Sequence, residues 1–248
     1  MMTGSPPRLP QRSHARSNRA RILTAAREEL GRDPDVSLDE IARAAGVVRR
    51  TLYGHFLNRE ALIDALAAEA KQSLEEALTA ARRPGADPPT ALARLILASW
   101  AVGDRYRMLI SLHRTRTEER IRAALAPTRA EVTSILERGQ RDGTFAGHLP
   151  APILALAAES VALAVLESET LADWSDPTGE AAATAVLIAA GIDPASARRY
   201  VHTVLKEDSA GPGGRPPGTP RMRSAPRGGT SPAHRPLTGP QGPGSLGR

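Results

Sequence analysis

The chain has 248 residues, a formal net charge of +6 and no cysteine. The missing cysteine excludes disulfides, zinc–thiolate sites and thiol catalysis, and the length allows one large domain or two smaller ones. The start of the chain lacks the apolar segment of a secretory signal, and charges interrupt every apolar run before it reaches the length of a membrane span, so we expect a cytoplasmic protein.

The positive charge lies at the two ends of the chain. Residues 22–208 hold all 27 acidic residues but only 22 of the 33 basic ones, which gives this stretch a formal charge of −5. We expect residues 1–17 to form a disordered basic arm that runs into the first helix. The glycine- and proline-rich residues 207–248 cannot bury enough apolar surface to offset their conformational entropy, so we expect a disordered tail.

Residues 18–62 are predicted to form three short helices. Apolar residues at helical spacing from Ile22 to Leu30 indicate the first helix, and Pro34 keeps its predecessor out of helical backbone space. Ser37, followed three residues later by Glu40, is typical of a capping box, in which each side chain bonds the other residue's backbone N–H. A second helix is therefore predicted to begin at Leu38.

The second and third helices are predicted to be joined by one tight turn. Gly46 follows the second helix, at the position where a left-handed residue is favoured and only glycine adopts that conformation cheaply. Leu52 and Phe56 then lie four residues apart on one face of a third helix. Two helices joined by a short glycine-containing turn are typical of the DNA-binding helix-turn-helix, whose second helix, here roughly residues 48–54, lies in the major groove.

With Leu52 buried, the outward face of the third helix presents Arg49, Arg50, Tyr53 and Thr51. Arginine suits the O6 and N7 atoms of guanine as a bidentate donor, and tyrosine or threonine hydroxyls bond phosphate. The alternative is a solvated basic turn on a small helical bundle. The cap, the glycine turn and the buried pair all agree with the helix-turn-helix, which favours the DNA-binding interpretation.

These residues closely resemble the amino-terminal domain of the TetR/AcrR family of transcriptional regulators. The matching motifs are Leu38-Asp39-Glu40-Ile41-Ala42, Ala45-Gly46-Val47, Thr51-Leu52-Tyr53, His55-Phe56 and Asn58-Arg59-Glu60-Ala61-Leu62, with a weaker match at Gly139-Gln140-Arg141-Asp142-Gly143-Thr144-Phe145. The resemblance implies an all-α homodimer. Each subunit would have a three-helix DNA-binding head, a linking fourth helix and an all-helical ligand-binding and dimerisation body.

The resemblance also assigns DNA contacts by position. Thr51, Tyr53 and His55 look like phosphate or groove contacts, and Arg59, at the start of the fourth helix, resembles a clamp on the DNA backbone. The full expected set is Ser37, Val48, Arg49, Arg50, Thr51, Tyr53, His55 and Arg59. The sequence departs from the family pattern at three positions, with Val48 in place of serine or threonine, Arg50 in place of a small residue and Leu57 in place of proline or lysine. A valine cannot cap the third helix, which costs about 0.5–2 kcal/mol relative to a hydroxyl.

The body is predicted to span residues 63–206, without any alternating strand pattern. The predicted helices cover residues 59–82, 88–100, 106–113, 121–125, 127–143, 150–174, 178–190 and 193–205. The helices at 150–174 and 178–190 are apolar on several faces, so they are buried in a core or against a second chain. The resemblance makes them the dimer helices, and an ordinary monomer core is the alternative.

Four residues are candidates for the wall of an effector pocket. By resemblance, Trp100, Tyr106, Met108 and His113 fall in the segment that lines the effector cavity of family members. Small-molecule pockets are mostly apolar with a few polar groups, and these side chains would suit an apolar or aromatic ligand. The alternative is that they are ordinary core or surface residues.

No enzymatic pattern competes with this interpretation. The six histidines have no pair at metal-ligand spacing, and no nucleophile elbow of the form Gly-x-Ser-x-Gly is present, so no enzyme, metal or cofactor is expected. The chain is predicted to be a ligand-responsive regulator. It would act as a repressor that binds a near-palindromic operator as a homodimer and is released by a small-molecule effector. Control by a protein partner, or no effector at all, is the alternative. The arm and the tail either add DNA backbone contacts or are neutral extensions.

Overall fold

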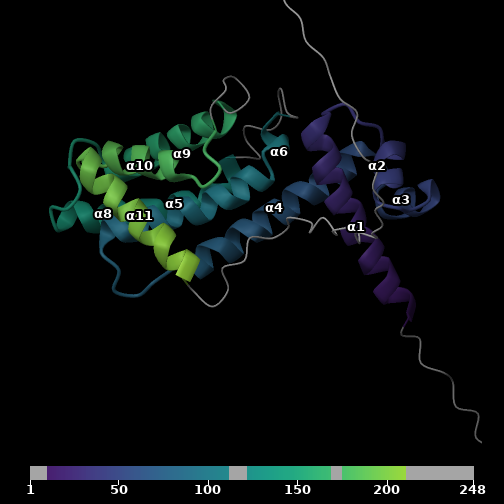
Figure 1. Ribbon diagram of the computed structural model, residues 1–248, viewed down its shortest axis with the longest axis horizontal. Coiled ribbons are helices and arrows are strands. Elements are labelled where there is room, and N and C mark those ends of the chain that lie inside the picture. Colours follow the sequence, from purple (N-terminus) through teal and green to yellow (C-terminus); the bar gives the residue numbers. More distant parts are fainter. Residues whose placement is uncertain (1–9, 112–121, 169–174, 211–248) are drawn as a thin grey trace, which may run out of the picture. The chain divides into compact units, whose positions relative to one another are not determined.

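The computed structural model describes residues 10–111, 122–168 and 175–210, and all regular structure within these ranges is α-helical (Figure 1). The helices are α1 (Pro10–Arg32), α2 (Leu38–Ala44), α3 (Arg49–His55), α4 (Arg59–Ala81), α5 (Pro88–Arg105), α6 (Met108–Ser111), α8 (Ala126–Arg141), α9 (Ala151–Ser168), α10 (Glu180–Ala189) and α11 (Pro194–Ala210). The all-α prediction is confirmed for the described residues.

The first helix is longer than the sequence predicted. It begins at Pro10, so residues 10–17 are helical and the prediction of a disordered arm is wrong for them. Proline is favoured at the first helical position, and adding residues to an existing helix costs far less than nucleating one. At the other end, α11 continues past the predicted boundary at Lys206 to Ala210. Residues 1–9 and 211–248 lie outside the described part.

Two hydrophobic clusters organise the described helices. The head is α1, α2, α3 and the first half of α4, and its cluster contains Ile22, Leu30, Ile41, Leu52, Phe56, Leu62 and Leu66, joined by Tyr106, Met108 and Leu109 from the end of α5 and from α6. The body is the second half of α4 with α5, α6 and α8–α11, and its main cluster includes Leu74, Leu78, Leu92, Leu136, Leu154, Leu187 and Val201. Because α4 contributes to both clusters, a movement of this helix would be felt by both.

Helix α9 is the most apolar long helix that the structure describes. It packs against α8 and α10, and its 18 residues have a mean hydropathy of 1.6, which by length and composition alone would suit a membrane span. Core helices of soluble proteins pass the same test. Glu159 in this helix forms an ion pair with Arg129 of α8, so one face of α9 carries a charge paired within the protein. The described part of the helix runs to Ser168, and the predicted boundary at residue 174 lies outside the described residues.

Candidate nucleic-acid interface and ligand cavity

The start of α2 is held by the predicted capping box. The N–H of Glu40 donates to the Ser37 hydroxyl at 3.3 Å, and the N–H of Ser37 donates to the Glu40 carboxylate at 2.9 Å. The bonds from Ser37 hold the pKa of the Glu40 carboxyl below its ordinary value. The Ser37 hydroxyl, which the sequence placed among the DNA contacts, is therefore engaged inside the head.

The turn between α2 and α3 is fastened by an arginine of α1. Gly46 adopts the predicted left-handed conformation, with φ of 62°. The guanidinium of Arg21 donates to the carbonyl oxygens of Ala45 at 2.6 Å and Gly46 at 2.9 Å. A cation bonded to the last carbonyls of a helix also opposes the negative end of its dipole. From the sequence, Arg21 was only one of the basic residues near the amino terminus, but its contacts show that it holds the turn after α2.

Helix α3 rests on Leu52, which is fully buried, and on Phe56 just beyond its end. Val48 precedes the helix and offers no side-chain cap, as the sequence predicted, and it is 70% exposed. Arg49, Arg50 and Tyr53 lie on the exposed side. The burial pattern therefore agrees with the predicted outward face for these three residues, while Thr51 is half-buried.

The two arginines of α3 differ in their partners. Arg49 forms an ion pair with Asp39 at 2.7 Å, and its guanidinium lies 5.3 Å from the ring centroid of Tyr53. Arg50 is exposed and has no hydrogen bond or ion pair to any residue that the structure describes. Arg50 is therefore the arginine of α3 whose donors are free for an external acceptor. Thr51 and His55 are half-buried on the same helix.

Arg59 has an internal role that the resemblance did not imply. Its guanidinium donates to the backbone carbonyls of Pro34 and Val36, in the segment between α1 and α2. Asn58 caps α4 as predicted, accepting from the N–H of Ala61 at 2.8 Å. Arg59 thus clamps the chain's own backbone, where the resemblance implied a DNA phosphate.

A polar junction connects the head to the body. The hydroxyl of Tyr106, at the end of α5, donates to the carboxylate of Glu69 on α4 at 2.8 Å. Arg27 of α1 pairs with the same carboxylate at 3.2 Å and lies 5.6 Å from the centroid of the Tyr106 ring. Burial, as the largest cause, raises the pKa of the Tyr106 hydroxyl, so the group remains a hydrogen-bond donor at neutral pH. These three side chains join α1, α4 and α5.

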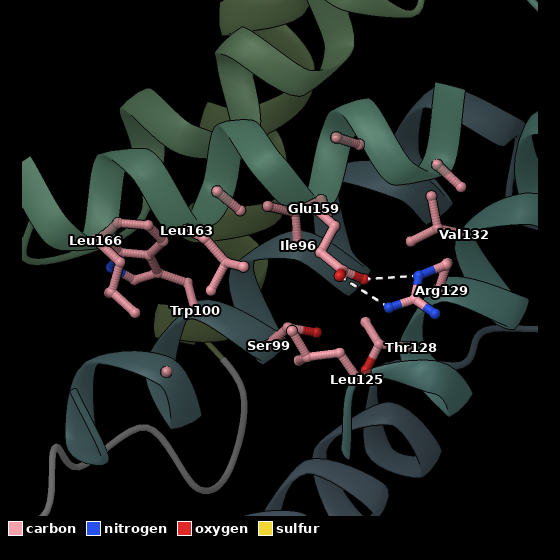
Figure 2. A pocket seen from close by; sticks show the side chains of 14 residues that line it. Ile96, Ser99, Trp100, Leu125, Thr128, Arg129, Val132, Glu159, Leu163 and Leu166 are labelled. Carbon is pink, nitrogen blue, oxygen red and sulfur yellow. Dashed lines mark hydrogen bonds and ion pairs between the residues drawn. The ribbon is translucent and has the colours of Figure 1, made fainter. Parts of the chain in front are cut away.

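Two adjoining cavities lie in the body. The first, of about 100 Å³, is bounded by α5, α8 and α9 and by Leu125 (Figure 2). The second, of about 170 Å³, lies between α4, α5, α6 and α9. Both are lined by Ser99, Gly103, Leu125, Leu163 and Leu166. Since they share five lining residues, the two cavities are neighbouring parts of one site.

The cavity walls are apolar except for a few groups. In the first cavity, the guanidinium of Arg129 donates twice to the carboxylate of Glu159, at 2.9 and 2.8 Å, as drawn in Figure 2. The hydroxyls of Ser99 and Thr128 are buried and have no hydrogen-bond partner among the residues that the structure describes. Among the described residues, no cluster of histidine or acidic side chains could hold a metal ion.

The four residues that were predicted to line a ligand pocket lie in different places. Trp100 lines the first cavity, although its indole N–H donates to the carbonyl of Asp176 at 2.9 Å. Tyr106 lines the second cavity. Met108 is buried in the head cluster and is not part of either cavity wall. His113 lies outside the described residues.

Sequence reasoning missed the polar groups of the cavity. Arg129 and Glu159 are 30 residues apart in the chain and lie on different helices. Ser99 and Thr128 occur in helices without any motif around them. A long-range pairing of this kind leaves no local signal, and only the apolar pattern of the helices indicated that a core would form here.

Comparison with known proteins places this geometry among bacterial regulators. The sequence profile described as "Bacterial regulatory proteins, tetR family" matches residues 22–66, and no curated protein matches the sequence. The structure of a regulatory protein in the tetR family from Rhodococcus RHA1 is similar with a TM-score of 0.54 and 25% identity, over 76% of this chain and 95% of that one.

Two further similar structures contain ligands. The TetR-like regulator LfrR from Mycobacterium smegmatis, in complex with proflavine, aligns with a TM-score of 0.57 and 20% identity, over 73% of this chain and 98% of that one. The transcriptional regulator FadR from Bacillus subtilis, in complex with stearoyl-CoA, aligns with a TM-score of 0.58 and 18% identity, over 70% and 99%. At these identities the likeness is one of fold: a helix-turn-helix head on an all-helical body.

Proposed function

Because the chain belongs to the TetR family of bacterial regulatory proteins, we propose that it represses transcription by binding a near-palindromic operator as a homodimer. A small-molecule effector releases the dimer. The observation that carries the DNA-binding part is the outward face of α3, where Arg50 has no partner among the described residues and Leu52 on the opposite side is buried. Such an arginine suits the bidentate acceptors of guanine in the major groove.

Dimerisation is supported by the outer faces of α9 and α10. Ile153 and Leu156 on α9 are 49% and 43% exposed, and Ile188 on α10 is 41% exposed. The two helices pack against each other. An apolar surface of this kind on a soluble protein marks an interaction site. Two symmetric heads would read half-sites about one helical turn, or a multiple of it, apart.

Effector release is supported by residues that belong to the cavity and to the head at once. Tyr106 and Leu109 line the second cavity and are also part of the head cluster. Tyr106 is bonded through Glu69 to α1. A ligand that binds one arrangement of these groups better than the other would shift α4, which carries the head. The ligand can change the equilibrium between the two arrangements by no more than the difference in its binding free energy for them.

The alternative is a DNA-binding regulator controlled by a protein partner, or one without an effector. The ligands in the similar structures, proflavine and stearoyl-CoA, belong to those proteins, and they favour a small molecule here only by analogy of fold. A screen for thermal stabilisation by metabolites separates the two, because a ligand that binds the native state stabilises it by mass action. A regulator of this kind acts in the cytoplasm, where its DNA lies.

The test of the proposed function is selection of binding sites by the full chain from a pool of randomised duplexes. We expect inverted repeats with a fixed spacing and an affinity that falls steeply with salt, since each head should neutralise several phosphates. Sedimentation of the free protein should give a dimer. Selection of no sequence at low ionic strength, or a protein that sediments only as a monomer, would contradict the proposal.

A further inference from the structure

The first cavity presents no net charge to a ligand. Among the described residues that line it, Arg129 and Glu159 are the only ionised side chains, and two hydrogen bonds hold them together. Their side chains are only 20% and 18% exposed. An anionic ligand could bind the Arg129 guanidinium only by displacing Glu159, which would leave a buried carboxylate unpaired. A cationic ligand could bind the Glu159 carboxylate only by displacing Arg129, which would leave a buried guanidinium unpaired. Breaking a buried pair in this way is strongly unfavourable.

Two hydroxyls of the same wall have unused hydrogen-bonding capacity. Serine and threonine inside helices often bond the carbonyl four residues earlier. Thr133 on α8 bonds Arg129 in this way at 2.8 Å, and Ser160 on α9 bonds Leu156 at 3.0 Å. Ser99 and Thr128 make no such bond, and both hydroxyl oxygens are buried. Figure 2 shows both side chains among those that surround the cavity.

We propose that the effector is a neutral, largely apolar molecule whose single hydroxyl or carbonyl group bonds to Ser99 and Thr128. The proposal rests on the proposed function, because it names the ligand class of the cavity assigned to the effector. The apolar part of the ligand lies against Ile96, Val132 and Leu163, which line the same cavity. A hydroxyl suits the site because serine and threonine both donate and accept. An unpartnered buried hydroxyl is costly, so the ligand gains by supplying its partner.

Ser99 and Leu166 also line the second cavity. A ligand held at Ser99 therefore has room to extend toward Tyr106 and Leu109, which belong to the head cluster as well. The polar group holds the ligand at Ser99, which lines both cavities, and an apolar extension into the second cavity contacts residues that connect with the head.

The test uses the full chain and four probes of similar shape that differ in one group. They are 1-naphthol, 1-methylnaphthalene, 1-naphthoate and protonated 1-naphthylmethylamine, and binding is measured by titration calorimetry. We expect 1-naphthol to bind most tightly, about tenfold better than 1-methylnaphthalene, because each hydrogen bond contributes roughly a three- to tenfold factor. Both charged probes should bind more weakly than either neutral one.

Three variants locate the polar group. Ser99→Ala and Thr128→Val should each weaken 1-naphthol roughly three- to tenfold and leave 1-methylnaphthalene unchanged. Thr184→Val is the matched control, because Thr184 on α10 also has a buried, unpartnered hydroxyl but lines neither cavity. It should not change the affinity for any probe. All three variants should unfold at the same temperature as the parent or higher, since each removes an unpartnered polar group.

Tightest binding of a charged probe, equal binding of 1-naphthol and 1-methylnaphthalene, or no binding of any probe would each overturn the ligand class. None of these results bears on sequence-selective duplex binding by the free protein, which tests the proposed function separately. The expected order of affinities without any loss of duplex binding would support the ligand class and contradict effector release.

Discussion

The head and the body use their polar groups in opposite ways. In the head, the groups around the helix ends bond one another: Ser37 with Glu40, Arg21 with the turn at Gly46, and Arg59 with the backbone before α2. In the body, the hydroxyls of Ser99 and Thr128 are buried beside a cavity and bond none of the described residues. A head fastened at these three places presents a fixed surface to a rigid duplex, while a body with spare bonding capacity has room for a ligand.

The largest expected effect on stability comes from substituting a glycine that has positive φ and closely packed surroundings. Gly179 has φ of 77°, and a Cβ on it would stand 2.5 Å from Cγ of Trp100. Gly143 has φ of 78° with no atom within 4 Å of such a Cβ. We expect Gly179→Ala to cost about 3 kcal/mol of stability, since a left-handed alanine costs about 1–2 kcal/mol and overpacking against a buried ring about 1–3 kcal/mol.

Gly143→Ala is the matched control and should cost only the backbone part, about 1–2 kcal/mol. Urea unfolding of both variants measures the difference. Because Trp100 also lines the first cavity, Gly179→Ala should weaken probe binding too. Equal stability of the two variants would mean that the Trp100 ring yields to the new methyl group, and that this wall of the cavity is not tightly packed.

Arg50→Ala tests whether the head presents one free base-reading group. Because Arg50 has no partner among the described residues, its removal should cost DNA affinity without loss of stability. A bidentate contact to guanine is worth about 1–3 kcal/mol of discrimination. We expect the selected duplex to bind roughly ten- to a hundredfold more weakly, with preference lost at one position of each half-site.

Arg198→Ala on the exposed side of α11 is the control for the loss of one positive charge, and its DNA affinity should change little. Arg49→Ala provides a comparison within α3. Arg49 is already paired with Asp39, so its loss should reduce affinity less than the loss of Arg50. An Arg50→Ala protein that keeps both affinity and sequence preference would contradict the docking of α3 in the groove.

Tyr106→Phe removes one hydrogen bond between the two regions. Its hydroxyl bonds Glu69 at 2.8 Å, a contact worth about 0.5–1.5 kcal/mol of stability. Duplex binding by the free protein should be unchanged, because the hydroxyl bonds Glu69 of α4 and the ring stays in the head cluster. The loss of duplex affinity caused by saturating 1-naphthol should shrink by about 0.5–2 kcal/mol, the usual effect of a change along a coupling path.

Tyr200→Phe on α11 makes the same chemical change away from the junction between head and body, and it should leave both duplex affinity and its response to 1-naphthol unchanged. Anisotropy of a labelled duplex, with and without the probe, measures both quantities. A full ligand response in Tyr106→Phe would place the coupling elsewhere than in the Arg27–Glu69–Tyr106 junction.

In the head, the sequence predicted the features that depend on neighbouring residues. The cap at Ser37, the turn at Gly46 and the buried Leu52 depend on residues within a few positions of one another, and each was found in the structure where it was expected. The longer-range bonds of Arg21 and Arg59 to the same segment were not anticipated. They depend on which carbonyls the packed head brings near the middle of α1 and the start of α4, and the spacing of residues does not encode that.

The body was predicted as a set of helices but not as a site. The spacing of apolar residues indicated α5, α8 and α9, because the helical repeat of these residues can be read within each segment alone. The cavity arises where these helices meet, and its ion pair joins Arg129 to Glu159. Of the residues taken from the resemblance, Trp100 and Tyr106 line the cavities, while Met108 belongs to the head cluster instead.

The smallest predicted effect is the pH dependence of the capping box in the head. Hydrogen bonds from Ser37 lower the pKa of Glu40 in the folded protein, so folding favours the ionised carboxylate. The stabilisation is present above the pKa of the unfolded chain, roughly pH 4, and is lost as the pH falls through the lower folded value. Glu40→Gln should therefore unfold more easily than the parent at pH 7 and should approach the parent as the solution is acidified.

Ser37→Ala shows whether the hydroxyl is the cause. In that background Glu40→Gln should change the pH dependence of urea unfolding less, because the main bond that lowers the pKa has been removed. A gap between the parent and Glu40→Gln that stayed constant from pH 7 to below pH 4 would mean that the carboxylate acts through something other than its charge. Because the Ser37 hydroxyl bonds Glu40 in this cap, Ser37→Ala should weaken DNA binding only indirectly, through the lower stability of α2.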